Sequence, residues 1–451
     1  MYKKELTEFK DRKGIDDWLQ NHRREYSNLI YHFSEDDNND KVEKFEKAKL
    51  RLLFVMLSDG PTRSVSNTLN AVFALCRQKV NNDDLFLDFC YFPHVQYRDA
   101  MIEDGIPLMH GAITHAPWHE YDAVLMSHSI QPECFNIPHM FYNSGVSLGH
   151  KSRLNEEGTP LIVYGGAASV ESILITGAVG EDEDDRSLVD IGLMGYGDHW
   201  LPQEIIDLMK MKTELGDIKS PENKKKLMEY LIAESPQKGN YYFPWAYKFN
   251  WINDKENGIF KFTGYERLDP RVPDRVKVND VKDGMFLGWT KKHFLLSGEN
   301  ANSSEVMISK GCSSGSCSFC HEGLISGAWQ EKSLEVIKEE LREVKRQSAP
   351  NNVSSYSYNL NYYAHFLDLL GLYSQEFSTM SLINNRTDIM AAEPDYIRLS
   401  KALGLKRFSG AVEGFGDRLR NKILNKNLPR EVWMQAVRNI LAEKVTEYKW
   451  G

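Results

Sequence analysis

The pattern of hydrophobic and polar positions changes three times along the chain. Residues 1–47 place a few apolar side chains, among them Trp18 and Leu19, between many charged ones, which predicts an N-terminal helical segment. Residues 48–215 alternate short apolar runs with helical stripes. Residues 216–300 are less regular and aromatic, and we expect a linker there. The strand–helix alternation resumes over residues 301–451.

The first alternating region predicts a doubly wound, Rossmann-like α/β domain. Its apolar runs are short, are separated by helical patterns, and mostly end in Ser, Gly or Asp. The predicted strands cover residues 52–57, 85–91, 123–126, 161–164 and 191–194. Strands that alternate with helices form parallel sheets, and such sheets bind ligands at the carboxyl ends of their strands.

The second alternating region predicts four strands and the start of a fifth, separated by amphipathic helices. These strands are expected at residues 306–309, 356–360, 378–383, 408–412 and 445–450. Within the linker, the turn-rich aromatic stretch 239–265 predicts a β-hairpin. The chain is therefore expected to be an α/β protein with two α/β domains.

Charge and hydropathy narrow the class of protein. The chain has 451 residues, with 55 Lys and Arg against 64 Asp and Glu, and this acidic balance argues against a nucleic-acid partner. No apolar run approaches the roughly 20 residues of a membrane span. The charged N-terminus lacks the apolar core of a signal peptide. We expect a cytoplasmic protein without a membrane partner.

Three of the six cysteines gather in one short segment. Cys312, Cys317 and Cys320 have the spacing C-x4-C-x2-C on a Gly- and Ser-rich loop after a predicted strand. Three thiolates can hold an iron–sulfur cluster and leave one iron open to another ligand. The alternative is a structural zinc ion with His321 as fourth ligand, since three Cys and one His are a common zinc set.

The three-cysteine loop, with an aromatic residue before its last cysteine and βα units after it, resembles the radical SAM superfamily. The stretches 409–420 and 424–426 resemble the region around the fourth strand of these enzymes. The preceding sheet resembles the cobalamin-binding domain fused to some of them, with Gly165-Gly166 and residues 195–198 where that domain has strand-end glycines. The aromatic linker is similar to that of an uncharacterised cobalamin-type subgroup.

The resemblance implies cofactors and site residues. Cys312, Cys317 and Cys320 would each bind one iron of a 4Fe–4S cluster, and S-adenosylmethionine (SAM) would bind the fourth iron. Phe319 would pack near the adenine, while Asn359, Arg386 and Glu413 could contact SAM. Cobalamin would lie against the first sheet, at Ser58, Gly60, Ser66, Ser127, Gly165, Gly166, Gly195, Gly197 and Asp198.

The sequence departs from the family pattern in three respects. The common cysteine spacing is C-x3-C-x2-C, one residue shorter between the first two cysteines. The Asp-x-His-x-x-Gly motif of many cobalamin domains is absent, so we expect no histidine ligand to cobalamin from the protein. The family barrel has six βα units, so the barrel predicted here is partial and apparently truncated. An open edge of this kind predicts a second chain, or self-association, that completes the barrel.

These features predict a radical SAM enzyme, in which cobalamin serves methyl or related radical transfer to an unknown substrate. No catalytic side chain beyond the cofactor ligands is predicted. A reductant such as flavodoxin or ferredoxin is expected as partner. One alternative is a non-catalytic or split-enzyme subunit that pairs with a chain supplying the rest of the barrel. Another is a zinc-stabilised binding protein.

Overall fold

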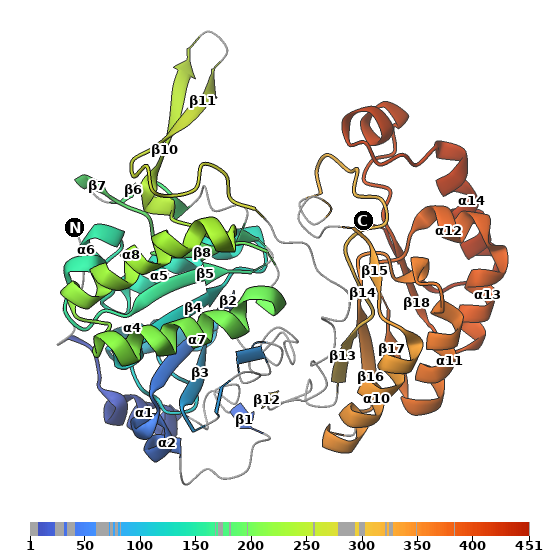
Figure 1. The fold of residues 1–451 in the computed structure, drawn as a ribbon. Helices are drawn as coiled ribbons and strands as arrows, with labels where there is room; N and C mark the ends of the chain where they lie inside the picture. Colours follow the sequence, from blue (N-terminus) through green and yellow to red (C-terminus); the bar gives the residue numbers. More distant parts are fainter. Residues whose placement is uncertain are drawn as a thin grey trace. The chain divides into compact units, whose positions relative to one another are not determined.

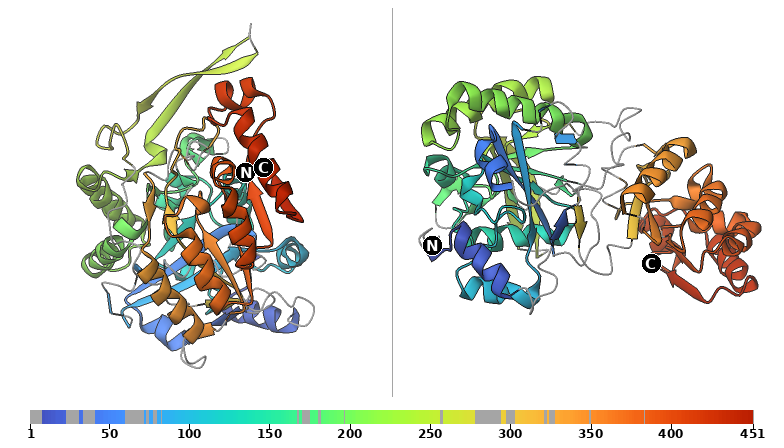
Figure 2. Two further views of the ribbon diagram at one scale, coloured as in Figure 1. Left: turned by 90° about the vertical axis from the view of Figure 1, so that its right-hand side faces the viewer. Right: turned by 90° about the horizontal axis from the view of Figure 1, so that it is seen from below.

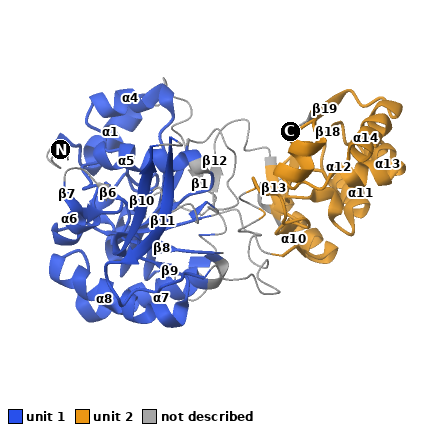
Figure 3. Ribbon diagram, turned by 90° about the horizontal axis from the view of Figure 1, so that it is seen from above, with its two compact units in different colours: residues 1–31, 35–63, 72–281 blue, residues 32–34, 64–71, 282–451 orange. Residues whose placement is uncertain are grey.

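A computed structural model gives the fold of most of the chain. It describes residues 8–22, 31–33, 41–59, 72, 75–76, 80–81, 83–166, 168–169, 175–179, 182–195, 197–255, 258–277, 294–296, 303–320, 323, 328–348, 350–382 and 384–450. These residues divide into two compact units (Figure 3). Unit 1 comprises residues 1–31, 35–63 and 72–281, and unit 2 comprises residues 32–34, 64–71 and 282–451.

Unit 1 is built on a six-stranded sheet in the order β3-β2-β4-β5-β8-β9. Its strands are β2 (Leu50–Asp59), β3 (Leu85–Phe92), β4 (Ala123–Ser127), β5 (Leu161–Gly165), β8 (Ile191–Leu193) and β9 (Tyr241–Tyr242). The first five are parallel, and β9 is antiparallel to β8. Numbered along the chain, the parallel strands run 2-1-3-4-5, so the order reverses between β2 and β4. This is the switch point at which doubly wound sheets bind ligands.

Helices cover both faces of this sheet, as the predicted doubly wound fold requires. Figure 3 shows α4 and α5 on one side of the strands and α7 and α8 on the other. The helices of unit 1 are α1 (Arg12–His22), α2 (Lys41–Lys47), α4 (Val95–Glu103), α5 (Asn136–Tyr142), α6 (His150–Asn155), α7 (Gly197–Leu215) and α8 (Pro221–Lys238), with short turns Trp118–Glu120, Gln131–Phe135 and Pro244–Ala246. All residues of β4 and β5 are buried, which explains their continuous apolar runs.

A buried ionic network fixes the strand β5 to the helix α6. Asp190 accepts hydrogen bonds from Arg153 Nη2 at 2.7 Å, His150 Nδ1 at 2.9 Å and the Ile162 amide at 2.7 Å. Burial tends to raise the pKa of Asp190, but the charges and hydrogen bonds of Arg153 and His150 outweigh burial and hold it far below its usual range. The carboxylate therefore stays ionised inside the unit.

The region expected as a linker begins as part of unit 1. α8 and β9 lie in it, and β9 extends the six-stranded sheet, so the boundary expected after residue 215 falls inside the compact unit. The hairpin expected over 239–265 is present as β10 (Tyr247–Asp254) and β11 (Ile259–Arg267). It projects from unit 1 as a two-stranded ribbon (Figures 1 and 2). A smaller ribbon pairs β6 (Ala178–Val179) with β7 (Asp182–Arg186).

Unit 2 repeats a strand–helix pattern, which confirms the second α/β region. Its parallel strands are β13 (Ser303–Met307), β16 (Asn352–Tyr356), β17 (Thr379–Ser381), β18 (Arg407–Gly410) and β19 (Glu447–Trp450). An isolated parallel β-bridge pairs Asn385, which follows β17, with Gly410 at the end of β18. Four of these strands overlap the predicted positions, whereas β16 ends at Tyr356, where its predicted strand was expected to begin. Completion of the barrel by a second chain stays a prediction.

Helices cover one face of the unit 2 strands (Figure 1). They are α10 (Leu334–Ser348), α11 (Phe366–Glu376), α12 (Thr387–Ala392), α13 (Pro394–Ala402), α14 (Arg430–Ala442), a turn at Leu360–Tyr362 and a π-helix at Arg418–Ile423. Short pairs join β14 (Ser309–Lys310) to β15 (Gln330–Glu331) and β1 (Tyr31–Phe33) to β12 (Phe294–Leu296). The core under the helices includes Ile337, Leu369 and Phe408. No helix among the described residues has the length and apolarity to cross a bilayer.

Candidate functional site

The cysteine loop of unit 2 follows β13 and β14, at the carboxyl end of the first parallel strand. Cys312, Cys317 and Cys320 are partly buried and none forms a disulfide. The Gly315 amide points to Cys312 Sγ at 3.5 Å, and the Gly323 amide points to Cys320 Sγ at 3.3 Å. Backbone N–H groups directed at sulfur stabilise thiolates and the anionic clusters that thiolates bind.

Asn359 approaches Cys312 from the loop after β16. Its Nδ2 donates a hydrogen bond to Cys312 Sγ at 3.2 Å. Partial burial tends to raise the pKa of Cys312. The hydrogen bonds from Gly315, Asn359 and Ser314 and the positive charge of Arg386 outweigh burial and lower this pKa below its ordinary value. The Cys312 environment thus favours the thiolate, which is the form that binds metal.

Arg386 reaches the cysteine loop from the segment after β17. Its Nη1 donates to Ser313 Oγ at 2.7 Å, and its Nε and Nη2 bind Asp388 at 3.0 and 2.6 Å. The guanidinium also lies 5.6 Å from the ring centre of Tyr362. Asp388 and Tyr362 therefore fix the guanidinium beside Cys312.

Glu413 and Lys426 lie near the Cys317 part of the loop. Glu413 follows β18 and adopts a left-handed backbone with φ 63°, and its carboxylate pairs with Lys426 Nζ at 3.1 Å. The same ammonium lies 5.8 Å from the ring centre of Phe319. Burial raises the pKa of Cys317, and the charge of Lys426 acts against this rise. Lys426 thus supplies positive charge where the loop carries its thiols.

The segment after the π-helix holds the cysteine loop in place. Asn425 Nδ2 donates to the Ser316 carbonyl at 2.7 Å. The Ser318 amide donates to the Leu424 carbonyl at 3.0 Å, and the Ser318 hydroxyl donates to the Ile423 carbonyl at 2.7 Å. The two side-chain bonds are exposed, and they join segments more than one hundred residues apart. They form the direct support for the loop between Cys312 and Cys320.

The residues predicted in unit 2 gather at one edge of its sheet. Asn359, Arg386 and Glu413 each follow the carboxyl end of a different parallel strand, and Phe319 lies within the cysteine loop. The prediction did not single out Lys426, Asn425, Ser313 and Asp388 as site residues. Lys426 and Asn425 lie in the stretch 424–426, and the resemblance of this stretch to the family was the sequence feature that pointed to them. The roles of all these residues toward a cofactor stay predictions.

The donor set of the loop fits a 4Fe–4S cluster. Three free thiols, backbone N–H donors and two nearby cations suit an anionic iron–sulfur centre. Within the part of the chain that the structure describes, no group of three or more His, Cys, Asp or Glu side chains is arranged to hold a metal ion. In a 4Fe–4S cluster each cysteine would bind a different iron, so the three thiolates need not converge on one ion. The alternative ligand His321 lies outside the described residues.

The described residues among those predicted for the first sheet lie at or just after the carboxyl ends of its strands. Ser58 lies in β2, and Ser127 ends β4, so they flank the switch point. Ser127 is paired with Met56 on one side and with Gly165 on the other. The edge thus combines small side chains with the position that doubly wound sheets use for ligands.

Gly166 has a structural requirement of its own. Its φ is 110°, and a Cβ at this position would lie 2.4 Å from the carbonyl oxygen of His128. The close approach of this turn to the residue after β4 therefore demands glycine whether or not a ligand binds. His128 is fully buried, and its Nδ1 is hydrogen-bonded to the Tyr164 hydroxyl, so this nitrogen is engaged within the protein.

Two further predicted residues lie after β8, and three others are not fully described by the structure. Gly195 follows β8 with φ 94°, and Gly197 begins α7. The backbone of Asp198 lies in α7, but its side chain is outside the described set. Gly60 and Ser66 lie outside the described residues altogether. The roles of all the residues predicted at this edge stay predictions.

Comparison with known proteins gives a family for the second unit. Residues 306–449 match the model of the radical SAM superfamily. No curated protein matches the sequence.

Solved structures show likeness at low identity. The structure of the radical S-adenosylmethionine methyltransferase TsrM from Kitasatospora setae, with cobalamin and a [4Fe–4S] cluster bound, is 11% identical, covers 89% of this chain and 69% of its own, and has a TM-score of 0.48. The cobalamin-dependent S-adenosylmethionine radical enzyme OxsB, with aqua-cobalamin bound, is 13% identical, covers 91% of this chain and 50% of its own, and has a TM-score of 0.43.

The family match spans β13 to β19 and includes the whole cysteine loop together with Asn359, Arg386, Glu413 and Lys426. A radical SAM domain implies a 4Fe–4S cluster and SAM. Residues 306–449 of this chain, which include the cysteine loop, are thus similar to the radical SAM superfamily.

Proposed function

We propose that the chain is a cobalamin-dependent radical SAM enzyme that transfers a methyl or related group to a substrate of unknown class. The observation that carries the proposal is the cysteine loop of a radical SAM domain, surrounded by Asn359, Arg386 and Lys426. A 4Fe–4S cluster bound there supplies the electron that cleaves SAM and produces a 5′-deoxyadenosyl radical.

The chain's own residues serve to bind and orient. Cys312, Cys317 and Cys320 supply three thiolates, which leaves one iron for the amino and carboxylate groups of SAM. Asn359 hydrogen-bonds Cys312 Sγ and so sets the direction of this thiolate. Arg386 and Lys426 offset the negative charge of a cluster. In this proposal the half-exposed ring of Phe319 packs against the adenine.

Unit 1 has the fold features of a cobalamin domain. The strand order of its parallel sheet reverses between β2 and β4. Ser58 and Ser127 lie at the carboxyl ends of these two strands. A broad, flat corrinoid needs close approach to the backbone, which the small residues Ser127 and Gly165 permit. The proposal that cobalamin binds here rests on this edge of the sheet. The similar solved structures have TM-scores below 0.5 and do not add to it. As before, we expect no histidine ligand from the protein.

The second candidate is a non-catalytic or split-enzyme subunit that pairs with another chain. The observation that favours it is the strand β19, which pairs with β18 on one side only among the described residues. A second copy or another chain that adds strands beyond β19 would complete a barrel. A reductant such as flavodoxin or ferredoxin remains the expected partner of a catalytic form.

Anaerobic purification and reconstitution test the proposal. About four irons and four sulfides per chain, and SAM-dependent formation of 5′-deoxyadenosine under reduction, are expected for the wild type. Cys317→Ala is expected to abolish both. A folded, iron-loaded protein that leaves SAM intact, alone or with added reductant, would favour the subunit alternative.

Corrinoid binding has its own variant and control. Among the described residues, a Cβ on Gly197 would meet Trp200 at 3.8 Å, so Gly197→Phe adds bulk at the carboxyl edge without backbone strain. We expect this variant to lose most bound corrinoid. Gly371→Phe, on α11 of unit 2 with open space around its Cβ, is the matched control and should bind as the wild type does.

A further inference from the structure

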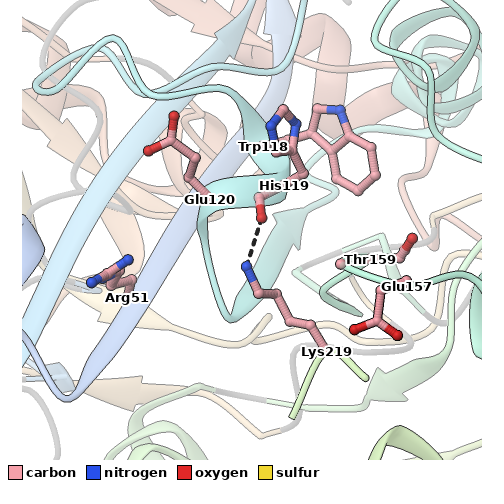
Figure 4. Close-up of a pocket in the computed structure, with 8 residues that line it drawn as sticks. Arg51, Trp118, His119, Glu120, Glu157, Thr159 and Lys219 are labelled. Atoms are coloured by element: carbon pink, nitrogen blue, oxygen red, sulfur yellow. Dashed lines mark hydrogen bonds between the residues drawn. The ribbon is translucent and has the colours of Figure 1, made fainter. Parts of the chain in front are cut away.

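A cavity lies at the opposite edge of the unit 1 sheet from the proposed cobalamin site. Its volume is about 370 Å³. Arg51 lies near the start of β2, Glu120 precedes β4 and Thr159 precedes β5, so the cavity opens at the amino ends of these strands. The lining residues are Arg51, Trp118, His119, Glu120, Glu157, Gly158, Thr159 and Lys219 (Figure 4).

Three nitrogen-bearing side chains of the cavity have unused hydrogen-bonding capacity. Lys219 Nζ donates one hydrogen bond, to the His119 carbonyl at 2.7 Å, and is drawn reaching toward that carbonyl in Figure 4. Arg51 donates from Nη2 to the Glu46 carbonyl at 2.9 Å, while its buried Nε has no partner. The buried Nδ1 of His119 also has no partner. Buried polar atoms in native proteins are normally paired, so these nitrogens are open to a ligand or to water.

The carboxylates close to these cations have partners of their own, although Asp217, which accepts from the Lys219 backbone amide at 3.0 Å, offsets part of the Lys219 charge. Asp122 accepts from Lys212 Nζ at 2.6 Å and from the Arg51 backbone amide at 2.8 Å. Glu120 forms an ion pair with Arg12. Among the described residues, neither Arg51 nor Lys219 forms an ion pair. Two cations therefore face the cavity with their charges uncompensated by a contacting carboxylate.

The remaining lining residues limit the size and charge of a ligand. The ring of Trp118 is buried and lies edge-on to the His119 ring at 5.8 Å, so it closes one wall with apolar surface. Glu157 is exposed, and water screens its charge. A volume of about 370 Å³ is that of a small-metabolite site.

We propose that this cavity binds a small metabolite through an oxyanion, a phosphate or a carboxylate, held by Arg51, His119 and Lys219. Arg51 Nε would donate to one oxygen, Lys219 would use its free protons for another, and His119 would donate from the unpartnered ring nitrogen in the appropriate tautomer. The site lies at the edge opposite Ser58 and Ser127, so its ligand is distinct from cobalamin and from SAM.

Calorimetric titration of the full-length protein with inorganic phosphate, and separately with glutarate, tests the proposal at constant ionic strength. Saturable binding of at least one probe is expected. Lys219→Gln retains a donor for the His119 carbonyl but removes the charge, and it should weaken binding by about ten-fold. Lys226→Gln removes an equal charge from an exposed ion pair on α8 and should change nothing.

The two titrations distinguish a phosphate ligand from a carboxylate ligand. Binding of phosphate alone identifies a phosphorylated ligand, binding of glutarate alone identifies a carboxylated one, and binding of both supports the shared site. Arg51→Lys gives a second test if Lys219→Gln unfolds, which a thermal melt would reveal. Absence of saturable binding by either probe, or equal weakening in Lys219→Gln and Lys226→Gln, would overturn the proposal.

Discussion

The side-chain amide of Asn359 donates a hydrogen bond to Sγ of Cys312 at 3.2 Å. Asn359 follows the second parallel strand of unit 2, and Cys312 follows the first. Adjacent parallel strands bring their carboxyl ends together, so this contact follows directly from the topology. It links the first cysteine of the loop to the rigid sheet.

Asn359→Ala should weaken cluster retention. The variant loses one donor to Cys312 Sγ, a hydrogen bond to a charged acceptor worth about 1.5–3 kcal/mol. We expect faster loss of iron to a chelator, measured by the decay of visible absorbance after anaerobic reconstitution. Asn352→Ala, at the amino end of the same strand, is the control. Equal rates of iron loss in the two variants would show that Asn359 does not stabilise the cluster.

Lys426→Gln should lower the reduction potential of the cluster. Its ammonium pairs with Glu413 and lies beside Phe319, near the thiol of Cys317. Loss of a partly exposed cation destabilises the more negative, reduced cluster, by roughly tens of millivolts. Redox titration followed by electron paramagnetic resonance measures the shift. Lys422→Gln, an exposed lysine of the π-helix, should leave the potential unchanged.

Asn425→Gly should loosen the cysteine loop. Asn425 has φ 50°, a backbone conformation that glycine adopts freely, so the substitution removes the hydrogen bond to Ser316 without imposing strain. Hydrogen exchange of the Ser318 amide should become faster, since this amide bonds Leu424 in the same contact. Asn427→Gly, at φ 52° and without that bond to Ser316, is the control. Unchanged protection of Ser318 would contradict a clamping role.

Asp190→Asn should destabilise unit 1 strongly. The substitution leaves the buried Arg153 guanidinium without its counter-charge, and breaking such a pair costs about 3–5 kcal/mol. Chemical denaturation followed by circular dichroism measures the loss. Asp182→Asn, which breaks the exposed pair with Lys151, should leave the free energy of unfolding almost unchanged, because water screens this pair. Similar losses for both variants would contradict the assigned role of the buried pair.

Glu204→Gln should flatten the pH dependence of unit 1 stability. Burial raises the pKa of Glu204 from its ordinary 4.5 to about 7, although Tyr241 and Lys238 act against this rise. The folded wild type therefore holds a proton that the unfolded chain releases, and its free energy of unfolding falls as the pH rises from 4.5 to 7. This loss is about 3 kcal/mol at most.

Denaturation at several pH values checks this prediction. Glutamine cannot release a proton, so the fall between pH 4.5 and 7 should be smaller in Glu204→Gln. The exposed Glu229→Gln should retain the wild-type slope. A slope in Glu204→Gln equal to that of the wild type would show that Glu204 does not titrate in this range.

The sequence predicted the strands of both units because their signals are local. The apolar runs of β4 and β5 and the small residues after them are visible in short windows, as is the cysteine loop. The order of the sheet was not predicted, because strand pairing joins distant segments. The antiparallel strand β9 was missed for the same reason, since two aromatic residues give no periodicity.

The hydrogen bonds that hold the cysteine loop were harder to predict from the sequence. Asn425 and Ser316 meet across 109 positions, and a lone Asn–Lys pair after a helix is typical of many surface turns. Gly165 and Gly166 illustrate the opposite case. The sequence assigned them to a ligand, while the structure gives Gly166 a separate reason in its close approach to His128.

The measurement that tests the central claim most directly is SAM cleavage by the anaerobically reconstituted chain, with iron, sulfide and corrinoid determined in the same sample. We expect about four irons per chain, bound corrinoid and reductant-dependent 5′-deoxyadenosine, with both iron and activity lost in Cys317→Ala. One zinc ion per chain, or a reconstituted protein that holds no iron, would contradict this claim.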